Sequence, residues 1–307
     1  MTTWRRAVAP AKLNLRLEVL GKRPDGFHEL DTDLITIDLA DELRARATGG
    51  DELRFTLGGP ALTTDVPADE RNLAFRAARL VQHEARARGA SRVGLELELT
   101  KQVPSRAGLG GASSDAVAAL VLADAVLDAR LGGAWLGERA AELGSDCRFF
   151  FDAHSGRARC TGRGEVVRPL DAPPSDWWIA LVTPDVACPT PLVFGALRFP
   201  LPALPESAPL GAGWTAERPA PRAGNHLQEA AFRVCPDFAP WSALLAAQSG
   251  AGWQLTGSGS SVFALFCARD DARAALETLC KDARDRGLKS RFESVVRPAG
   301  HGVRLAD

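Results

Sequence analysis

The sequence of 307 residues predicts an α+β protein with one or two domains. Residues 13–19 and 93–99 alternate between apolar and polar side chains, which is typical of half-buried strands. Residues 71–88 carry apolar side chains at helical spacing, and residues 270–286 form another helical segment that a glycine ends. With 46% hydrophobic residues the chain can build sizeable cores. In the second half, these patterns indicate strands and helices arranged in layers around an open sheet.

Composition narrows the class of protein. The formal net charge of −1 gives no electrostatic case for binding nucleic acid. No apolar run approaches the ~20 residues that a membrane span needs, and the first residues lack the apolar core of a secretion signal. The six cysteines form no C-x-x-C pair, so the sequence indicates neither a zinc site nor a disulfide framework. We therefore expect a cytoplasmic protein that binds neither nucleic acid nor membrane.

The first part of the chain offers two groups of candidate site residues. The first strand places Lys12 and Asn14 on its polar face. That face either points into a site or is solvated, and the pattern alone favours solvation. Residues 21–30 form a turn-rich loop in which Phe27 precedes His28. This pair can hold a planar ring, although Phe27 can equally anchor the core.

The central stretch is residues 104–115, where three glycines and several small residues lie between a strand and a helix predicted for residues 116–129. A glycine-rich turn that opens onto a helix presents free backbone N–H groups, which suit a phosphate. The order of residues matches neither the Walker loop nor the Rossmann fingerprint. Read alone, the stretch is either a phosphate-binding loop or a tight strand-to-helix turn.

Asp146 is a further candidate for chemistry. It follows a helix predicted for residues 134–143 and precedes a strongly apolar run. Such a carboxylate can act as a general base or can cap the next helix, and the segment alone favours the cap. Later, Phe194 lies where a loop leads into a helical turn, and residues 257–261 form a small-residue turn between strands. This turn is either an ordinary hairpin or a second loop that approaches a ligand.

The remaining elements complete the expected order. We expect further strands and helices at residues 35–39, 53–57, 177–182, 225–234, 241–248 and 291–296. Residues 199–224 are rich in Pro, Gly and Ala and have no clear periodicity, so we expect a long surface excursion there.

Three stretches together carry a family resemblance. Residues 10–15, 104–115 and 255–261 resemble, in order and spacing, the motifs of the GHMP small-molecule kinases. Residues 21–30, with their Gly-Phe-His sequence, are similar to a branch of this family whose substrate is a cytidine diphosphate sugar alcohol. The likeness covers nearly the whole chain and includes residues 70–73, 144–146 and 190–194.

The resemblance implies a ribosomal-protein-S5-like ATP-binding domain at residues 1–163 and a ferredoxin-like α+β substrate domain at residues 164–307. It implies ATP-dependent phosphorylation of a hydroxyl group in isoprenoid synthesis, with Mg²⁺ as cofactor and a monomer or homodimer as the assembly. The implied ATP site consists of a loop and two outlying residues: Asn72, Lys101, Pro104, Ser105, Arg106, Ala107, Gly108, Leu109, Gly110, Gly111, Ala112, Ser113 and Ser114.

The resemblance also implies roles in the transfer. Asp146 takes the proton of the substrate hydroxyl, and Lys12 keeps Asp146 ionised. Ser113 and Ser114 point hydroxyls toward the phosphates or Mg²⁺, and no other metal ligand is assigned. The implied substrate residues, with two aromatic rings around the cytosine and a histidine at its edge, are Asn14, Phe27, His28, Phe194, Gly257, Ser258, Gly259 and Ser260.

Some residues depart from the family pattern. Arg106 and Ala107 stand where small residues are common, and His226 stands where an aspartate is expected. Arg148 follows Asp146 closely, and a guanidinium that pointed inward would depress the pKa of that carboxyl and weaken it as a base. The alternatives are a kinase of this family for mevalonate or homoserine, or a non-catalytic metabolite-binding protein. An RNA-binding role rests on fold analogy alone.

Overall fold

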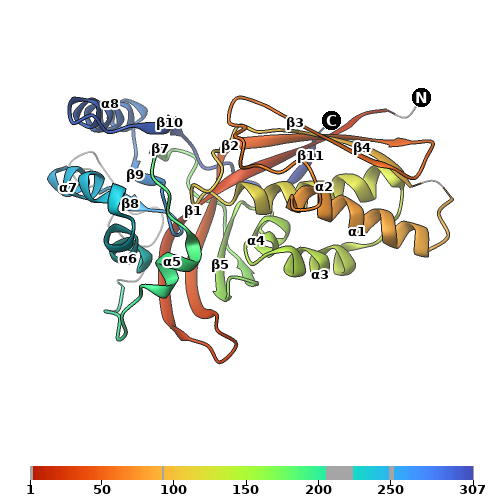
Figure 1. The fold of residues 1–307 in the computed structure, drawn as a ribbon, viewed down its shortest axis with the longest axis horizontal. Coiled ribbons are helices and arrows are strands. Elements are labelled where there is room, and N and C mark those ends of the chain that lie inside the picture. The colour runs from red at the N-terminus through yellow and green to blue at the C-terminus, as the bar shows by residue number, and fades with distance from the viewer. Residues whose placement is uncertain (1–2, 92, 205–223, 249–251, 307) are drawn as a thin grey trace.

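The chain folds into two lobes, each built on its own β-sheet (Figure 1). The computed structural model describes residues 3–91, 93–204, 224–248 and 252–306. In the larger lobe the strands follow the order β11, β1, β2, β4, β3, and β5 and β6 extend from β2. Its elements are β1 (Arg5–Lys22), β2 (His28–Thr48), β3 (Leu53–Gly58), α1 (Leu73–Ala87), β4 (Gly94–Thr100), α2 (Gly111–Leu127), α3 (Gly133–Leu143), α4 (Cys147–Asp152), β5 (Arg157–Gly162), β6 (Val166–Pro169) and β11 (Arg304–Ala306).

The smaller lobe has an antiparallel sheet in the order β10, β7, β9, β8. Helices cover this sheet, so the α+β prediction is confirmed in both lobes (Figure 1). The elements are β7 (Trp178–Pro184), α5 (Thr190–Gly195), α6 (Leu227–Val234), the short 3₁₀ helix η1 (Pro236–Phe238), α7 (Ala239–Ala247), β8 (Gln254–Leu255), β9 (Val262–Phe266), α8 (Arg269–Asp285) and β10 (Ser290–Val296).

One long antiparallel pair joins the lobes. β1 pairs with β2 along nearly its whole length, with register shifts at three places. The first part of β1 packs into the core of the larger lobe through Ala7 and Ala9, and the last part packs into the smaller lobe through Leu17 and Val19. Lys12 and its neighbours therefore lie where the lobes meet.

The lobes do not divide the chain at a single point. The expected boundary between residues 163 and 164 falls in the turn between β5 and β6, which pair with each other in the larger sheet. β11 also returns to this sheet and pairs with β1. The larger lobe thus holds the described strands from both ends of the chain.

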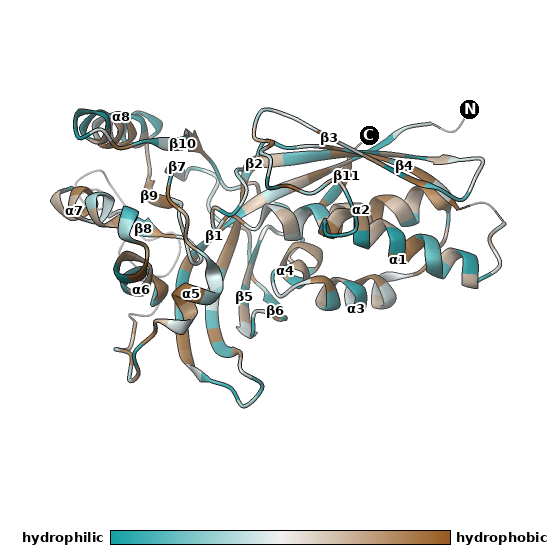
Figure 2. Cartoon of the chain, in the orientation of Figure 1, coloured by the Kyte–Doolittle hydropathy of each residue, from teal (hydrophilic) through white to brown (hydrophobic). Residues whose placement is uncertain are grey.

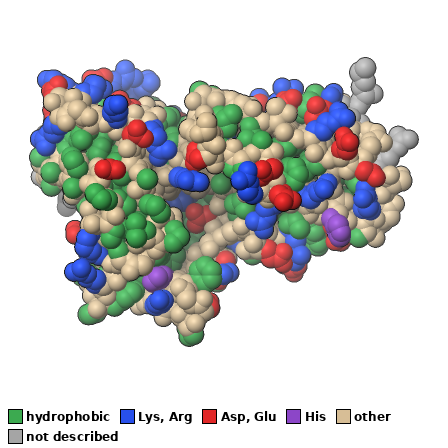
Figure 3. Space-filling view, viewed as in Figure 1, with side chains coloured by type: hydrophobic (Ala, Val, Ile, Leu, Met, Phe, Trp, Pro, Cys, Tyr) green, Lys and Arg blue, Asp and Glu red, His purple; other side chains and the backbone are tan. Residues whose placement is uncertain are grey.

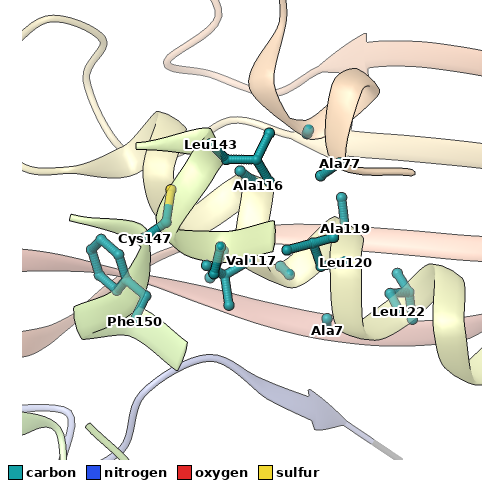
Figure 4. Close-up of a cluster of buried hydrophobic side chains, with 14 of the residues drawn as sticks. Ala7, Ala77, Ala116, Val117, Ala119, Leu120, Leu122, Leu143, Cys147 and Phe150 are labelled. Atoms are coloured by element: carbon teal, nitrogen blue, oxygen red, sulfur yellow. The ribbon is translucent and has the colours of Figure 1, made fainter. Parts of the chain in front are cut away.

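Helix α2 is the buried centre of the larger lobe. It begins at Gly111 and not at residue 116, because a glycine and two serines are weak helix formers and disguise its first turn. Hydrophobic colouring runs along α2, whereas α1 and α3 show hydrophilic residues between hydrophobic ones (Figure 2). Alanine side chains let α2 approach its neighbours closely, as the close-up shows for Ala119 beside Ala77 of α1 (Figure 4).

Most other expected elements were confirmed to within a few residues at their ends, but the strands expected at residues 13–19 and 35–39 are only the middle parts of the longer β1 and β2. Most of the expected surface excursion at residues 199–224 lies outside the described residues, which stop at residue 204 and resume at residue 224. In the described part of the chain, none of the helices combines the length and the apolar character needed to cross a membrane.

Candidate active site

The glycine-rich segment connects β4 to α2 and reaches the junction of the lobes. Gly108 and Gly110 have φ angles of 75° and 70°, which favour glycine. A Cβ atom at Gly108 would collide with the carbonyl oxygen of Thr256, and one at Gly110 would lie 2.9 Å from Cγ of Lys12. The segment therefore needs glycine at both positions to approach these neighbours. The first N–H groups of α2 follow directly, and a helix start leaves such groups available to an anion.

A cavity of about 680 Å³, here called the ATP cavity, opens beside this segment. Residues 104–113 form one side, and the loop before α1 forms another. Each residue of the implied ATP site lines this cavity except Ser114, whose side chain is fully buried. Asn72 lines it too, but its Oδ1 caps α1 by accepting the N–H of Ala74 at 2.9 Å, and its Nδ2 donates to the carbonyl of Pro67 at 2.9 Å. Its side chain therefore has a structural role as well.

Lys101 belongs to a buried ion cluster beside the ATP cavity. Its Nζ donates to Asp41 and, at 2.7 Å, to Asp115, and all three side chains are buried. Burial acts to lower the pKa of Lys101, but the carboxylates of Asp115 and Asp41 outweigh burial and raise it. Asp41 also accepts the N–H groups of Gln102 and Val103. The cluster thus fixes the point at which the glycine-rich segment leaves β4.

Lys12 and Asp146 meet at the junction of the lobes. Lys12 is 3% exposed, and its Nζ lies 3.8 Å from Oδ2 of Asp146. Burial lowers the pKa of Lys12, and the charge of Asp146 opposes this shift. Asp146 stands just before α4, yet its side chain makes no capping hydrogen bond with this described helix. The cap interpretation is therefore wrong, and the carboxylate faces a buried ammonium instead.

Asn14 links Lys12 to the second small-residue loop. Its Oδ1 accepts hydrogen bonds from Nζ of Lys12 at 2.6 Å and from the N–H of Gly257 at 3.0 Å. Its Nδ2 donates a hydrogen bond to Oγ1 of Thr32 at 2.9 Å. Lys12 and Asn14 are only 3% and 4% exposed. The expectation that this face of β1 is solvated is therefore wrong, since it forms a buried polar network between the lobes.

The second loop packs directly against the glycine-rich segment. The N–H of Ser261 donates to the carbonyl of Ala107 at 3.1 Å. Arg291 of β10 spans the same contact, with Nη1 donating to the carbonyl of Ser105 at 3.2 Å and Nη2 to Oγ of Ser260 at 3.4 Å. The loop is therefore more than an ordinary hairpin, because it couples the two lobes beside Lys12.

Only part of the second loop reaches the substrate side. Gly257 and Ser258 line a second cavity, whereas Gly259 and Ser260 line neither this one nor the ATP cavity. Ser260 is fully buried, and its hydroxyl donates to the carbonyl of Pro184 at 2.9 Å. The structure thus brings two of the four expected loop residues to the cavity, while the other two support the loop.

The second cavity, here called the substrate cavity, also measures about 680 Å³ and extends from Lys12 and Asp146 to α5. Phe27, His28 and Phe194 line it, as expected. The ring centroids of His28 and Phe194 are 5.1 Å apart. Burial, and then the charge of Lys22, lower the pKa of His28 and favour its neutral form.

Positive charge accompanies these rings. Lys22 and Arg163 line the substrate cavity, and the guanidinium of Arg163 lies over the ring of Phe27 at 4.8 Å from its centroid. This end of the cavity therefore combines flat apolar surfaces with cations, a pairing that suits a planar base attached to phosphates.

The two cavities share Gly108, Gly110 and Ser113 as a common wall. Lys12 and Asp146 line the substrate cavity beside this wall. The surface of the molecule is hollowed between the lobes, with charged side chains around the hollow (Figure 3). A phosphoryl donor in one cavity and an acceptor in the other would meet at the shared wall, which is the positioning that phosphoryl transfer requires.

Arg148 and His226, two of the residues that depart from the family pattern, have partners other than the Lys12–Asp146 pair. Arg148 Nε donates to Oδ2 of Asp152 at 2.7 Å, one turn further along α4, so its guanidinium is paired there and not with Asp146. His226 Nδ1 accepts the N–H of Val19 at 3.0 Å. Neither residue disturbs the Lys12–Asp146 pair.

Several site residues were missed from the sequence: Lys22, Thr32, Asp41, Asp115, Arg163 and Thr190. Asp41 and Asp115 could have been identified from the sequence, because each lies next to an apolar run, and a buried carboxylate requires a partner cation. The others are polar residues without a local pattern, and only the assembled lobes reveal them.

Comparisons with known proteins identify the family of the chain. The family described as "GHMP kinases N terminal domain" matches residues 72–151, and "GHMP kinases C terminal" matches residues 216–285. A 4-diphosphocytidyl-2-C-methyl-D-erythritol kinase from Cereibacter sphaeroides is 39% identical over 282 residues, covering 89% of this chain and 93% of the relative. The kinase of the same name from Synechocystis sp. is 32% identical over 314 residues, covering 97% of each.

Solved structures give the same result. A crystal structure of 4-(cytidine 5'-diphospho)-2C-methyl-D-erythritol kinase superposes with a TM-score of 0.74 at 33% identity, covering 96% of this chain and all (100%) of that one. Homoserine kinase from Cytophaga hutchinsonii reaches 0.73 at 19% identity, covering 99% of this chain and 97% of that one, which shows the shared fold alone. The fold and the site define a small-molecule kinase of the GHMP class. Within this class, the chain belongs to the family of 4-diphosphocytidyl-2-C-methyl-D-erythritol kinases.

Proposed function

We propose that the protein transfers the γ-phosphoryl group of ATP to the 2-hydroxyl of 4-diphosphocytidyl-2-C-methyl-D-erythritol, a step of non-mevalonate isoprenoid synthesis. The observation that carries this proposal is the common wall of Gly108, Gly110 and Ser113 between the cavities, with Lys12 and Asp146 beside it. The names of the relatives support the choice of substrate.

The chemistry follows from the charges at this wall. The phosphates of ATP bind to the N–H groups of the glycine-rich segment, where the positive end of the α2 dipole favours them. Asp146 accepts the proton of the attacking hydroxyl. Lys12 lies 3.8 Å from that carboxylate, so its ammonium stabilises the alkoxide that develops there. Asn14 holds the ammonium in place through its 2.6 Å hydrogen bond.

The substrate lies along its cavity with the sugar alcohol at Asp146 and the cytosine at α5. Phe27 and Phe194 offer ring surfaces on which a cytosine can stack, and His28 offers a hydrogen-bonding edge. Lys22 and Arg163 supply positive charge for the diphosphate. This aromatic and cationic end gives no advantage to a small acceptor such as homoserine or mevalonate, so it is the part of the site that selects the cytidine group.

Mg²⁺ is the proposed cofactor. Among the described residues, no three His, Cys, Asp or Glu side chains gather to hold a metal ion. Mg²⁺ needs no such group, because it is commonly held by one or two carboxylates together with substrate phosphates and water. Asp115 fits this role, since it lines the ATP cavity and its Oδ1 has no described hydrogen-bond partner, and the hydroxyl of Ser113 is on the common wall. The ion supplies charge neutralisation for the phosphates.

The test is turnover with purified protein and Mg-ATP. ³¹P NMR should show a new phosphomonoester when 4-diphosphocytidyl-2-C-methyl-D-erythritol is supplied, and none with homoserine or mevalonate. CDP should inhibit by competition with the cytidine substrate. Turnover of homoserine or mevalonate, with no response to CDP, would show a kinase for another alcohol. No turnover of any acceptor would favour a non-catalytic binding protein.

A further inference from the structure

Arg106 occupies an unusual place in the glycine-rich segment. Its φ angle is 49°, a left-handed conformation that residues other than glycine rarely adopt. Its side chain is 79% exposed, and the residue lines the ATP cavity. Strained backbone of this kind is concentrated at functional sites, so Arg106 is a candidate for a role in nucleotide binding.

The other described cations that line the ATP cavity are already engaged. Lys101 is buried between Asp41 and Asp115. Arg71 binds both carboxylate oxygens of Asp69, with Nη2 2.7 Å from Oδ2 and Nε 2.9 Å from Oδ1. Lys101 cannot turn to a nucleotide without leaving its buried partners. Arg71 is 76% exposed, but two of its nitrogens bind Asp69, whereas Arg106 binds its carboxylate through Nε alone.

Arg106 has a weaker attachment. Its Nε lies 3.1 Å from Oδ2 of Asp65, a residue of the loop before α1 that also lines the ATP cavity. Asp65 is bound as well by the hydroxyls of Thr63 and Ser105, and the Thr63 hydrogen bond is the main reason why the pKa of Asp65 is lowered. Asp65 therefore keeps donors when the guanidinium leaves. An ion pair this exposed contributes little to stability, so it can exchange.

We propose that Arg106 binds the phosphate oxygens of ATP and that Asp65 holds its guanidinium at the rim of the cavity until the nucleotide exchanges with the carboxylate. A guanidinium suits this role because its planar N–H groups match phosphate oxygens in pairs. The inference rests on the proposed function in one respect, that ATP is the phosphoryl donor. It adds a side-chain cation to a site built chiefly from backbone N–H groups.

Arg130 provides a matched control. Its φ angle is 51°, its Nε lies 2.9 Å from Asp128, and its side chain is 82% exposed. It lies beyond the C-terminus of α2 and lines neither cavity. Arg106→Gly and Arg130→Gly therefore relieve the same backbone conformation, but only the first removes a cation from the ATP cavity. The experiment measures dissociation constants of the whole protein for ATP, ADP and AMP by calorimetry, without the cytidine substrate.

Arg106→Gly should raise the dissociation constants of ATP and ADP by about 10-fold or more and that of AMP by less than about 3-fold. The difference is expected because the lost contact is with the outer phosphates, which AMP lacks. Arg130→Gly should bind all three nucleotides like the wild type. Asp65→Asn should bind ATP about 2-fold more tightly, because a competing carboxylate is gone.

Three results would overturn the inference: wild-type ATP affinity in Arg106→Gly, equal losses for ATP and AMP, or weaker ATP binding in Asp65→Asn. The proposed substrate is tested by a separate result. A wild type that binds ATP but does not phosphorylate the cytidine substrate contradicts the proposed function and leaves the comparison of the arginine variants valid.

Discussion

Lys12→Met removes the ammonium that faces Asp146 and keeps a side chain of similar length. Lys12 is 3% exposed, and burial lowers its pKa, so its surroundings disfavour the charged form. Methionine carries no charge to desolvate, and Oδ1 of Asn14 still accepts the N–H of Gly257 at 3.0 Å. We therefore expect the melting temperature of this variant to equal or exceed that of the wild type.

Catalysis should respond in the opposite direction. Two unit charges at the 3.8 Å separation of Nζ and Oδ2 interact by about 4 kcal/mol at an effective dielectric constant of ~20. The Asp146 side chain is 37% exposed, so water screens the pair and we take about 2 kcal/mol as the remaining effect. This attraction holds Asp146 in its charged form, so its loss makes proton transfer to the carboxylate easier and does not slow the reaction. The expected loss of about 10²–10³-fold in kcat comes from the missing cation beside the developing alkoxide.

The assay is single-turnover transfer from [γ-³²P]ATP as a function of pH. Because the pKa of Lys12 is below its ordinary 10.5, the wild-type rate should fall on the alkaline side before pH 10.5, and Lys12→Met should lack this fall. In the wild type, Lys12 binds its proton more tightly in the unfolded chain than in the folded protein. The free energy of unfolding of the wild type should therefore rise with pH between the lowered pKa and 10.5, and that of Lys12→Met should not show this rise. A variant rate within about 3-fold of the wild type would refute the reasoning.

Other positions test individual contacts. Gly108→Ala should abolish ATP binding in calorimetry and lower stability by about 1–3 kcal/mol, because its Cβ collides with the Thr256 carbonyl; normal binding would contradict this. Lys22→Gln should raise the pKa of His28 in an NMR titration, since the charge of Lys22 helps to lower it from 6.5. An unchanged pKa would show that the charge of Lys22 does not act on His28. Arg148→Ala should keep kcat within about 3-fold of the wild type, because its guanidinium pairs with Asp152, and a 10-fold loss would place it in the active site.

Local patterns were enough to predict most elements of the fold. Residues 71–88 carry a helical stripe, and α1 spans Leu73–Ala87. The start of α2 was missed because its first turn carries Gly111 and two serines, which favour turns when judged by propensity. Burial of this helix between α1 and the sheet overrides that weak preference.

The site was harder to predict, because its pairs come from distant segments. Lys12 looked solvated until Asp146 and Gly257 were seen to cover the face of β1 on which it lies. The partners of Lys101 could not be predicted locally either, since the two carboxylates that bind it come from β2 and α2. The resemblance to the GHMP kinases placed Lys12 and Asp146 together where periodicity did not.

The most direct test of the central claim is the single-turnover rate of phosphoryl transfer by Asp146→Asn, with ATP and 4-diphosphocytidyl-2-C-methyl-D-erythritol both saturating. Asparagine keeps the shape of the side chain but cannot accept the hydroxyl proton as a carboxylate does. If Asp146 is the base beside Lys12, the rate should fall by about 10²–10⁴-fold while the ATP dissociation constant stays within about 3-fold. A variant that transfers phosphate at nearly the wild-type rate would contradict the account.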